Sequence, residues 1–320
     1  MPKAYSSRKG SLAFRPRKRS ETLNGRVRNW PDVSKPCLLG FAGYKAGMQH
    51  IIYNETDKNS PRKGKDVSVP TTIIEVPPIL VYAARVYKKT KVGKKLLGDY
   101  YVNDEKILKK AKVKDVLTID KINEVVKDII EVRVLALTSP FLTGIGKKKP
   151  EVLELGVGGE DIQKKIDYVK SILGKEISAE EVFEKGSYID VIAITKGKGW
   201  QGVIKKFGVS IQRRKATGKR RHVGNLGAWT PSVVEYTSLQ AGQMGYHKRT
   251  ILNNLIVDMG DSSSLKQEGG LLHYGEVRNK FILIKGSVPG PKKRLIKLRR
   301  ALRKTDNKKE MNVSYMSKAM

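Results

Sequence analysis

The sequence is poor in cysteine and in long hydrophobic runs. Cys37 is the only cysteine in 320 residues, which excludes an internal disulfide and any metal site built from several cysteines. No run approaches the roughly 18 apolar residues that a membrane-spanning helix needs. The opening residues, MPKAYSSRKG, are charged and lack the apolar segment of a secretory signal. We therefore expect a cytoplasmic protein that has no membrane partner.

Histidine is scarce as well, and its placement does not favour a metal site. The histidines are His50, His222, His247 and His273. No two of them lie one helical turn apart, and none has the carboxylate-rich neighbourhood of a metal ligand. A catalytic set built on Cys37 or on a serine, assembled across the fold, stays open, but no local sequence favours one. We expect no metal and no enzymatic activity.

Two glycine-rich stretches are similar to nucleotide-binding motifs, and both fall short. KGKGWQG at 196–202 lies between two runs that read as strands, with no helix expected after it, whereas the dinucleotide motif opens a helix. GKKLLGDY at 93–100 has the glycine spacing of a P-loop. Asp99 and Tyr100 stand where that loop needs Lys and Ser or Thr. We expect no cofactor and no small-molecule substrate.

Acidic residues are outnumbered about two to one by basic ones. The chain holds 64 Lys and Arg against 31 Asp and Glu, a formal net charge of +33. Such a charge attracts nucleic acid, and each cation placed on a phosphate releases condensed counterions. The composition predicts a nucleic-acid-binding protein.

The charge is unevenly distributed along the chain. Residues 97–190 hold 16 basic and 18 acidic side chains, whereas residues 1–36 hold ten and two, and residues 285–309 hold eleven and one. Residues 196–222 hold ten Lys or Arg and no acid. A segment that cationic cannot be buried without partners, so it needs water or an external polyanion. The pattern indicates a charge-balanced domain inside a strongly basic protein.

Hydrophobic periodicity predicts an α+β fold in which strands dominate. Short β-branched runs predict strands at 38–43, 71–76, 81–87, 132–137, 187–195, 202–207, 233–236, 250–258 and 280–285, with a charged loop at 57–66. Apolar residues at helical spacing predict a helix from Ile162 to Leu173, ended by Gly174, and a second helix at 122–130. The simplest architecture is a β-barrel interrupted by an α/β insertion.

The same features predict a division of the chain into five parts. Residues 1–36 form an extended basic arm; residues 37–87 and 183–288 form the barrel, with a basic loop at 209–232; residues 88–182 form the insertion; residues 289–320 form a basic tail. Phe14 and Trp30 of the arm either stack on bases or attach the arm to the protein's own surface.

The strongest functional candidate is RRKATGKRRHVGNLGAWTP at 213–231. Its cations lead into a stretch rich in glycine, in which Trp229 is either a core residue or the tip of a loop. Gly224, Gly227 and Pro231 nearby favour the loop tip. Stacking of a base on an aromatic ring contributes about 1–3 kcal/mol, which suffices to position a flexible loop.

Several motifs occur in the order found in one family. They are GSLAFRPRKR at 10–19, GFAGYKAGM at 40–48, TKGKGWQGVIKKFG at 195–208, GAWTP at 227–231, AGQMGYHKRT at 241–250 and HYGEVRNKFILIKGSVPGPKKR at 273–294. Across about residues 8–304 the chain resembles the large-subunit ribosomal protein L-three family in its archaeal and eukaryotic form.

The resemblance implies a structural constituent of the large ribosomal subunit. It implies a translation-type β-barrel with an α/β insertion, early incorporation into the subunit, and contacts with large-subunit rRNA and neighbouring large-subunit ribosomal proteins. It further implies that Trp229 approaches the peptidyl transferase centre beside the aminoacyl-tRNA site, within a cytoplasmic ribosome.

Basic and aromatic side chains of these segments are the candidate RNA-binding residues. They are Arg15, Arg17, Lys18, Arg19, Lys45, Lys196, Lys198, Trp200, Lys205, Lys206, Arg213, Arg214, Lys215, Lys219, Arg220, Arg221, His222, Trp229, His247, Lys248, Arg249, Lys292, Lys293 and Arg294. Two other interpretations remain: an RNA-modifying enzyme that uses the barrel as a platform, and a DNA-compacting protein.

Overall fold

The computed structural model describes residues 8–56, 59–111, 117–118, 122, 129–265, 269–303, 308–309 and 311–317. The chain divides into two compact units. One consists of Met1–Thr22 and Ile194–Lys248, and we call it the basic extension. The other consists of Leu23–Ala193 and Arg249–Met320, and we call it the main body. Strands dominate the structure, and the described helices are few and short.

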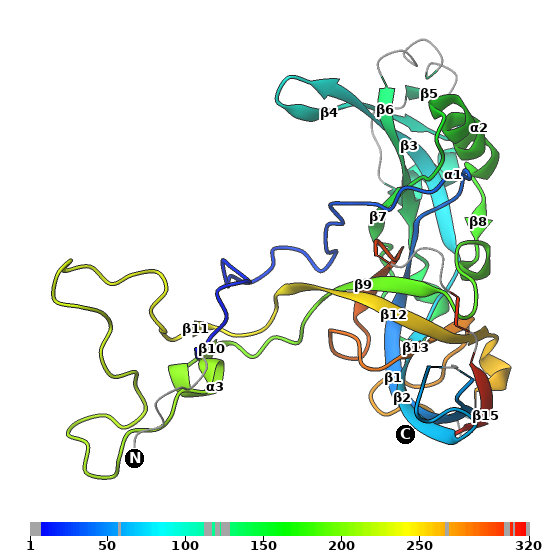
Figure 1. The fold of residues 1–320 in the computed structure, drawn as a ribbon. Helices are drawn as coiled ribbons and strands as arrows, with labels where there is room; N and C mark the ends of the chain where they lie inside the picture. The colour runs from blue at the N-terminus through cyan, green and yellow to red at the C-terminus, as the bar shows by residue number, and fades with distance from the viewer. Residues whose placement is uncertain are drawn as a thin grey trace. The chain divides into compact units, whose positions relative to one another are not determined.

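The main body contains a closed ring of strands (Figure 1). Its members are β1 (Gly40–Asn54), β2 (Asp66–Glu75), β9 (Tyr188–Ile194), β12 (Lys248–Gly260), β13 (Phe281–Lys285) and β14 (Leu295–Arg300). The order is β14-β9-β12-β13-β2-β1, and β1 also pairs with β14. Far along β1, residues 51–54 pair with β15 (Asn312–Met316). β-Branched and aromatic side chains such as Phe41, Ile73 and Ile296 fill the core.

A second sheet lies in residues 79–177 of the main body. It consists of β5 (Leu117–Thr118), β4 (Gly93–Tyr101), β3 (Ile79–Thr90), β6 (Ile129–Leu137) and β7 (Val152–Gly156), in that order, and β8 (Glu176–Ile177) pairs with β3. The helix α2 (Ile162–Ile172) contacts β6 and buries Ile166 and Val169. The short helix α1 (Glu105–Ala111) contacts β3.

Short elements complete the structure. The basic extension holds β10 (Trp200–Gln201), β11 (Gly242–Gln243) and the helix α3 (Val203–Phe207). Short 3-10 turns span Pro140–Leu142, Ala179–Glu181 and Ser262–Ser264. None of the helices in the described part of the chain is long and apolar enough to cross a membrane.

Most predicted elements are confirmed. The strands expected at 38–43, 71–76, 81–87, 132–137, 187–195, 250–258 and 280–285 correspond to β1, β2, β3, β6, β9, β12 and β13. The helix expected from Ile162 is α2, and Gly174 follows it with a φ of +78°. This left-handed backbone suits glycine after a helix, because no Cβ collides with the preceding carbonyl. Residues 57–58 of the expected charged loop lie outside the described residues.

Two predicted strands are wrong. Residues 203–207 form α3, which Gly208 ends with a φ of +68°. The argument that no helix follows KGKGWQG is therefore wrong too. The segment still differs from a dinucleotide-binding unit, because α3 has only five residues and the preceding strand β9 pairs antiparallel with β14. Residues 233–236 form no strand, and Val233, Val234 and Tyr236 are exposed. β-Branched residues raise strand propensity, but a strand forms only where a partner strand is present to pair with it.

The second predicted helix and the predicted tail also differ from the structure. Ile129 and Ile130, the end of the helix expected at 122–130, begin β6, and residues 123–128 lie outside the described residues. Within the segment expected to be a tail, β14 pairs between β1 and β9. The apolar residues Leu295, Ile296 and Leu298 are buried among the basic residues that predicted a tail, and the strand is paired on both sides.

Candidate RNA interface

The base of the basic extension is a tight crossing of two chain segments. β10 and β11 pair with Trp200 opposite Gln243. The Lys198 amide donates to the carbonyl of Met244 at 2.9 Å, and the Met244 amide donates to the carbonyl of Gly199 at 2.9 Å. The crossing holds Trp200 so that 75% of its surface is exposed. Lys196 and Lys198 are exposed beside it.

Glycine lets the two segments of this crossing approach. Gly245 has a φ of +72°, and a Cβ there would lie 2.1 Å from the carbonyl oxygen of Lys196. No side chain is compatible with that distance or with that backbone. Gly245 thus allows close packing against the segment that carries Lys196 and Lys198.

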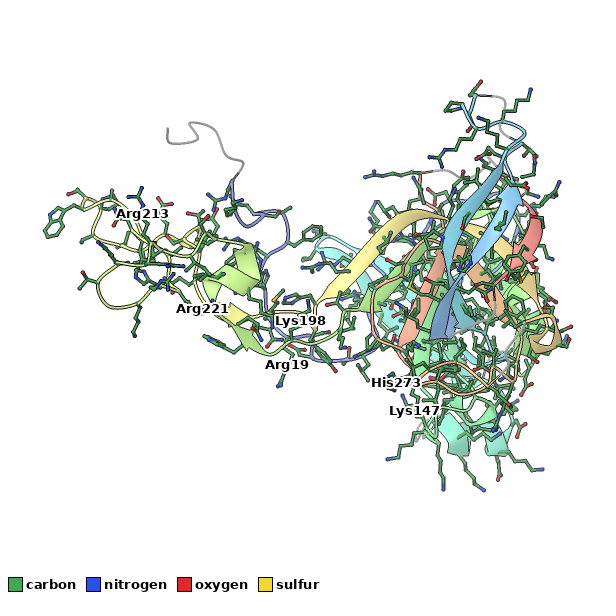
Figure 2. The ribbon with its side chains drawn as sticks, turned by 90° about the horizontal axis from the view of Figure 1, so that it is seen from below. Arg19, Lys147, Lys198, Arg213, Arg221 and His273 are labelled. Atoms are coloured by element: carbon green, nitrogen blue, oxygen red, sulfur yellow. The ribbon has the colours of Figure 1, made fainter. Side chains whose placement is uncertain are left out.

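An open hollow of about 790 Å³ lies at this base. Its lining comes from the arm and from both crossing segments: Arg19, Ser20, Glu21, Gly197, Gly199, Gln243 and Tyr246. Figure 2 labels Arg19 and Lys198 in this part of the extension. Glycine backbone next to cations is an arrangement in which a phosphate can come close to the main chain.

The arm is tied to the base by main-chain contacts. The Ser20 amide donates to the carbonyl of Tyr246 at 2.9 Å. The ring Nδ1 of His247 lies 3.0 Å from the carbonyl oxygen of Lys18, to which it donates. The His247 amide and carbonyl also bond Thr195. The structure gives His247 a role in holding the arm, whereas the sequence predicted an RNA contact.

The arm is also tied to the segment that follows the central loop. Arg8 Nη2 donates to the carbonyl of Thr237 at 2.8 Å. Arg15 Nη1 donates to the carbonyl of Tyr236 at 2.6 Å, and its guanidinium lies 5.0 Å from the centre of the Tyr236 ring. These contacts join two segments that are more than 200 residues apart in the sequence. The sequence did not predict that Arg8 and Tyr236 contribute to the candidate interface, because their contacts depend on the proximity of distant segments in the fold.

Cations gather around one aromatic ring at the end of α3. The Arg17 guanidinium lies 4.9 Å from the centre of the Phe207 ring, and Lys206 Nζ lies 5.0 Å from it. Burial, followed by the charges of Arg17 and Arg15, lowers the pKa of the Lys206 ammonium. Like charges disfavour one another at this range, so an anion bound among them would be favoured.

The central loop at 209–232 is exposed along its length. Its basic side chains Arg213, Arg214, Lys215, Lys219, Arg220 and Arg221 are all exposed, as is His222. Figure 2 shows Arg213 and Arg221 on this loop. Among the described residues these six cations form no ion pair with an acidic side chain. Trp229 is 94% exposed, so it belongs to a loop and not to the core.

The charge balance of the extension is extreme. It holds 18 Lys and Arg but only two acidic residues, Glu21 and Glu235. Glu21 lies 3.6 Å from Lys18, and Glu235 accepts a hydrogen bond from the Thr237 hydroxyl at 2.8 Å. Two carboxylates cannot neutralise this many cations, so the extension needs an external polyanion to balance its charge.

Lys45 is a correction to the predicted set of RNA-binding residues. Its side chain is buried, and its Nζ donates to the carbonyls of Val288 at 2.7 Å and Gly290 at 3.1 Å. Burial, and to a smaller extent the charge of Lys292, lowers its pKa. Lys45 therefore fixes a loop of the main body.

The remaining candidates divide between the two units. Lys205 is exposed on α3, and Lys248 is half-buried where β12 begins. Arg249 and Arg294 are half-buried in the main body, where Lys293 is exposed. Lys292 donates to the carbonyl of Leu272 at 2.6 Å.

The two aromatic residues of the arm behave differently. Trp30 packs on the main body, where a Cβ on Gly156 would lie 2.5 Å from its ring and a Cβ on Gly40 would lie 2.8 Å from it. Its role is attachment of the chain to its own surface. Phe14 is 58% exposed.

Within the described residues, no group of three or more His, Cys, Asp or Glu side chains could hold a metal ion. The candidate interface is therefore a surface of cations, glycines and exposed aromatics. Such a surface suits phosphate contacts and base stacking.

Comparison with known proteins identifies relatives along the whole chain. The family model described as ribosomal protein L3 matches residues 1–319. The large ribosomal subunit protein uL3 of Methanothermobacter thermautotrophicus is 45% identical over all of this chain and 98% of its own length. The uL3 proteins of Methanosphaera stadtmanae and Archaeoglobus fulgidus are each 46% identical, over 99% and 94% of this chain and 98% and 93% of their own lengths.

Proposed function

Because the chain belongs to the ribosomal protein L3 family, whose members are structural and non-enzymatic constituents of the large ribosomal subunit, we propose that its basic extension binds large-subunit rRNA. One observation carries this proposal: the extension has 18 cations and only two carboxylates, and hydrogen bonds of Arg8 and Arg15 hold its arm to the segment that follows the central loop. The cations neutralise phosphates, and the glycines allow close approach of the backbone.

The central loop is the part of the extension that reaches the functional centre of the subunit. Residues 209–232 extend toward the peptidyl transferase centre near the aminoacyl-tRNA site, with Trp229 at the tip. The exposure of Trp229 supports this, since an indole without intramolecular packing is available to stack on a base. The RNA catalyses peptide-bond formation. The protein acts as a scaffold and tunes the path of the tRNA.

The other parts of the chain have supporting roles. The closed ring of six strands is the translation-type barrel. Residues 88–182 are an insertion whose acid-balanced part faces solvent or neighbouring large-subunit ribosomal proteins. The protein joins the subunit early in its assembly. The described pairing of β14 with β1 and β9 supports the barrel, because it joins the two ends of the strand order.

Replacement of residues 213–231 by a short Gly-Ser linker tests the role of the loop. The main body should keep its unfolding temperature, because these residues belong to the extension. Large subunits that contain the variant should assemble but bind aminoacyl-tRNA less well than wild-type subunits. A variant whose main body unfolds, or whose subunits bind aminoacyl-tRNA normally, would contradict the proposal.

A further inference from the structure

The hairpin formed by β3 and β4 carries a dense group of lysines at its tip. Lys88, Lys89, Lys91, Lys94 and Lys95 lie within eight consecutive residues that include no acid. The register of the two strands places Lys88 opposite Lys95 and Lys89 opposite Lys94. Like charges directly opposite one another destabilise a hairpin, so the arrangement has a cost for the isolated protein.

Pairing with the rest of the sheet is described as far as the start of the tip. Among the described residues, β6 pairs with β3 as far as Lys88, opposite Ile129. The described part of the hairpin past that point has two strands, and a two-stranded hairpin contributes little stability of its own. Val92 at the turn is fully exposed, and Gly93 follows it with a φ of +139°.

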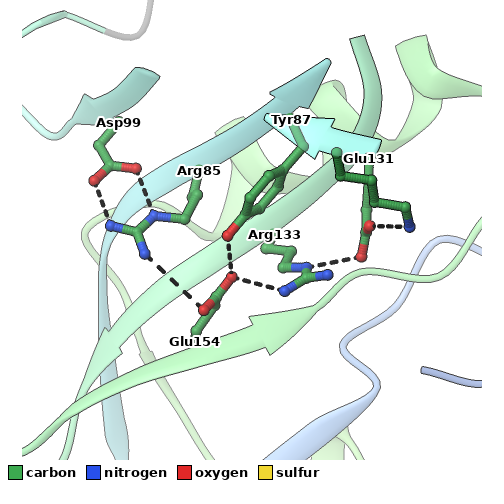
Figure 3. A network of polar contacts seen from close by, with 7 residues as sticks. Arg85, Tyr87, Asp99, Glu131, Arg133 and Glu154 are labelled. Carbon is green, nitrogen blue, oxygen red and sulfur yellow. Dashed lines mark hydrogen bonds and ion pairs between the residues drawn. The ribbon is translucent and has the colours of Figure 1, made fainter. Parts of the chain in front are cut away.

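Carboxylates pair with the arginines of this sheet (Figure 3). Arg133 donates to Glu154 at 2.9 Å and to Glu131 at 2.7 Å. Glu131 in turn accepts from Lys94 at 2.5 Å. Further down the hairpin, Asp99 accepts both hydrogen bonds of the Arg85 guanidinium.

Within the part of the chain that the structure describes, Lys89, Lys91 and Lys95 form no such pair. All three are exposed. Carboxylates therefore neutralise the inner cations of the sheet and Lys94, whereas Lys89, Lys91 and Lys95 stay exposed on the outer part of the hairpin. The residues that follow, 97–190, are nearly balanced in charge, so the excess of cations is confined to the hairpin.

We propose that this lysine hairpin, residues 88–95, is a second RNA-binding site that grips the phosphate backbone of an rRNA helix. The inference rests on the proposed function, because it takes rRNA as the partner, but it concerns a different unit of the protein. Lysine is a compact point charge with free donors, which suits phosphate contacts without base readout. Phosphates between the strands would remove the repulsion between the opposed lysines.

Charge-neutralising variants of the full-length protein test the site. The hairpin variant is Lys89→Gln, Lys91→Gln and Lys95→Gln. The matched control is Lys106→Gln, Lys109→Gln and Lys110→Gln on α1, which removes the same charge from exposed positions of the same sheet domain. The measurement is the affinity for large-subunit rRNA as a function of salt concentration.

Each lost phosphate contact lowers the slope of log affinity against log salt by about 1. The hairpin variant should therefore lose a slope of about 2 to 3, while the control keeps the wild-type slope. Equal changes in both variants would overturn the site. If wild-type protein shows no preference for large-subunit rRNA, the proposed function itself fails, which is a distinguishable outcome.

A crosslink identifies the partner directly. Val92→Cys in a Cys37→Ser background places one reactive thiol at the exposed turn, and Lys109→Cys serves as the control position. After coupling to an aryl azide and reconstitution into large subunits, the Val92 position should crosslink to rRNA and the Lys109 position should not. A crosslink from the turn only to an acidic segment of a neighbouring protein would overturn the proposal.

Discussion

The carbonyl oxygen of Lys196 lies only 2.1 Å from the place where a Cβ on Gly245 would stand. This close contact packs together the two chain segments that lead into and out of the central loop. The position of Gly245, 49 residues after Lys196, makes the contact invisible in the local sequence.

Gly245→Ala should disrupt the base of the extension. The residue needs a positive φ, which costs an alanine about 1 kcal/mol or more, and the clash with Lys196 adds to it. Gly199→Ala is the control, because Gly199 has a φ of +66° but open space around it. Limited proteolysis between residues 196 and 248 should accelerate more for Gly245→Ala. Equal acceleration would show that only the backbone angle matters.

Asp190→Asn should destabilise the main body by roughly 3–5 kcal/mol, the usual cost of breaking a buried ion pair. Asp190 is fully buried and accepts from the Arg299 guanidinium at 2.5 Å and from the Asn253 amide at 2.9 Å. Its loss of charge leaves Arg299 without compensation. Glu184→Gln, which breaks an exposed pair with Lys308, is the control and should change chemical denaturation little. A similar small effect of both variants would contradict the buried role of Asp190.

Lys45→Met should lower stability without weakening RNA binding. The substitution leaves the carbonyls of Val288 and Gly290 without their donor, at a cost of about 1–3 kcal/mol. The exposed Lys198→Met is the opposite case, with unchanged stability and lower affinity for rRNA. Denaturation and salt-dependent binding of both variants separate the two roles. A loss of affinity by folded Lys45→Met protein would restore the sequence-based assignment.

The charged network of the second sheet should make the protein less stable in acid. Burial opposes the ionisation of Glu131 and Glu154, but hydrogen bonds outweigh it: Arg133 and Lys94 at Glu131, and Tyr87 and Arg133 at Glu154. Both pKa values therefore lie below the ordinary 4.5. A lowered folded pKa contributes stability above the ordinary value, and this stability is lost as pH falls through the folded value.

Denaturation between about pH 5 and about pH 3 checks this dependence. Wild-type protein should lose unfolding free energy across that window more steeply than the double variant Glu131→Gln and Glu154→Gln. The double variant should already be less stable at neutral pH. Identical slopes for the two proteins would show that the network does not couple to folding.

Local periodicity was sufficient to predict helices with apolar residues at helical spacing and strands with a continuous apolar run. The helix from Ile162 and the apolar strands of the core are of this kind. It failed where strand formation depends on a partner strand. Among the described residues, Val233 and Val234 have strand-forming side chains but no partner strand. Leu295 to Arg300 forms a strand with a partner on each side, despite its basic residues. Strand pairing is a long-range property, which a window of the sequence does not contain.

The candidate site shows the same limit. Charge density located the central loop and the arm, and the glycines near Trp229 indicated an exposed tip. The sequence did not distinguish Lys45, a buried lysine that serves two carbonyls, from its exposed counterparts. It also overlooked the lysines at 88–95, because the balanced total charge of the following region concealed their grouping.

The most direct test of the central claim is UV crosslinking in cells, followed by sequencing of the attached RNA and mapping of the attached peptides. The account predicts crosslinks at a few sites of large-subunit rRNA, with peptides from residues 209–232 attached in the peptidyl transferase region. Crosslinks scattered over many transcripts, with none concentrated in that region, would contradict it.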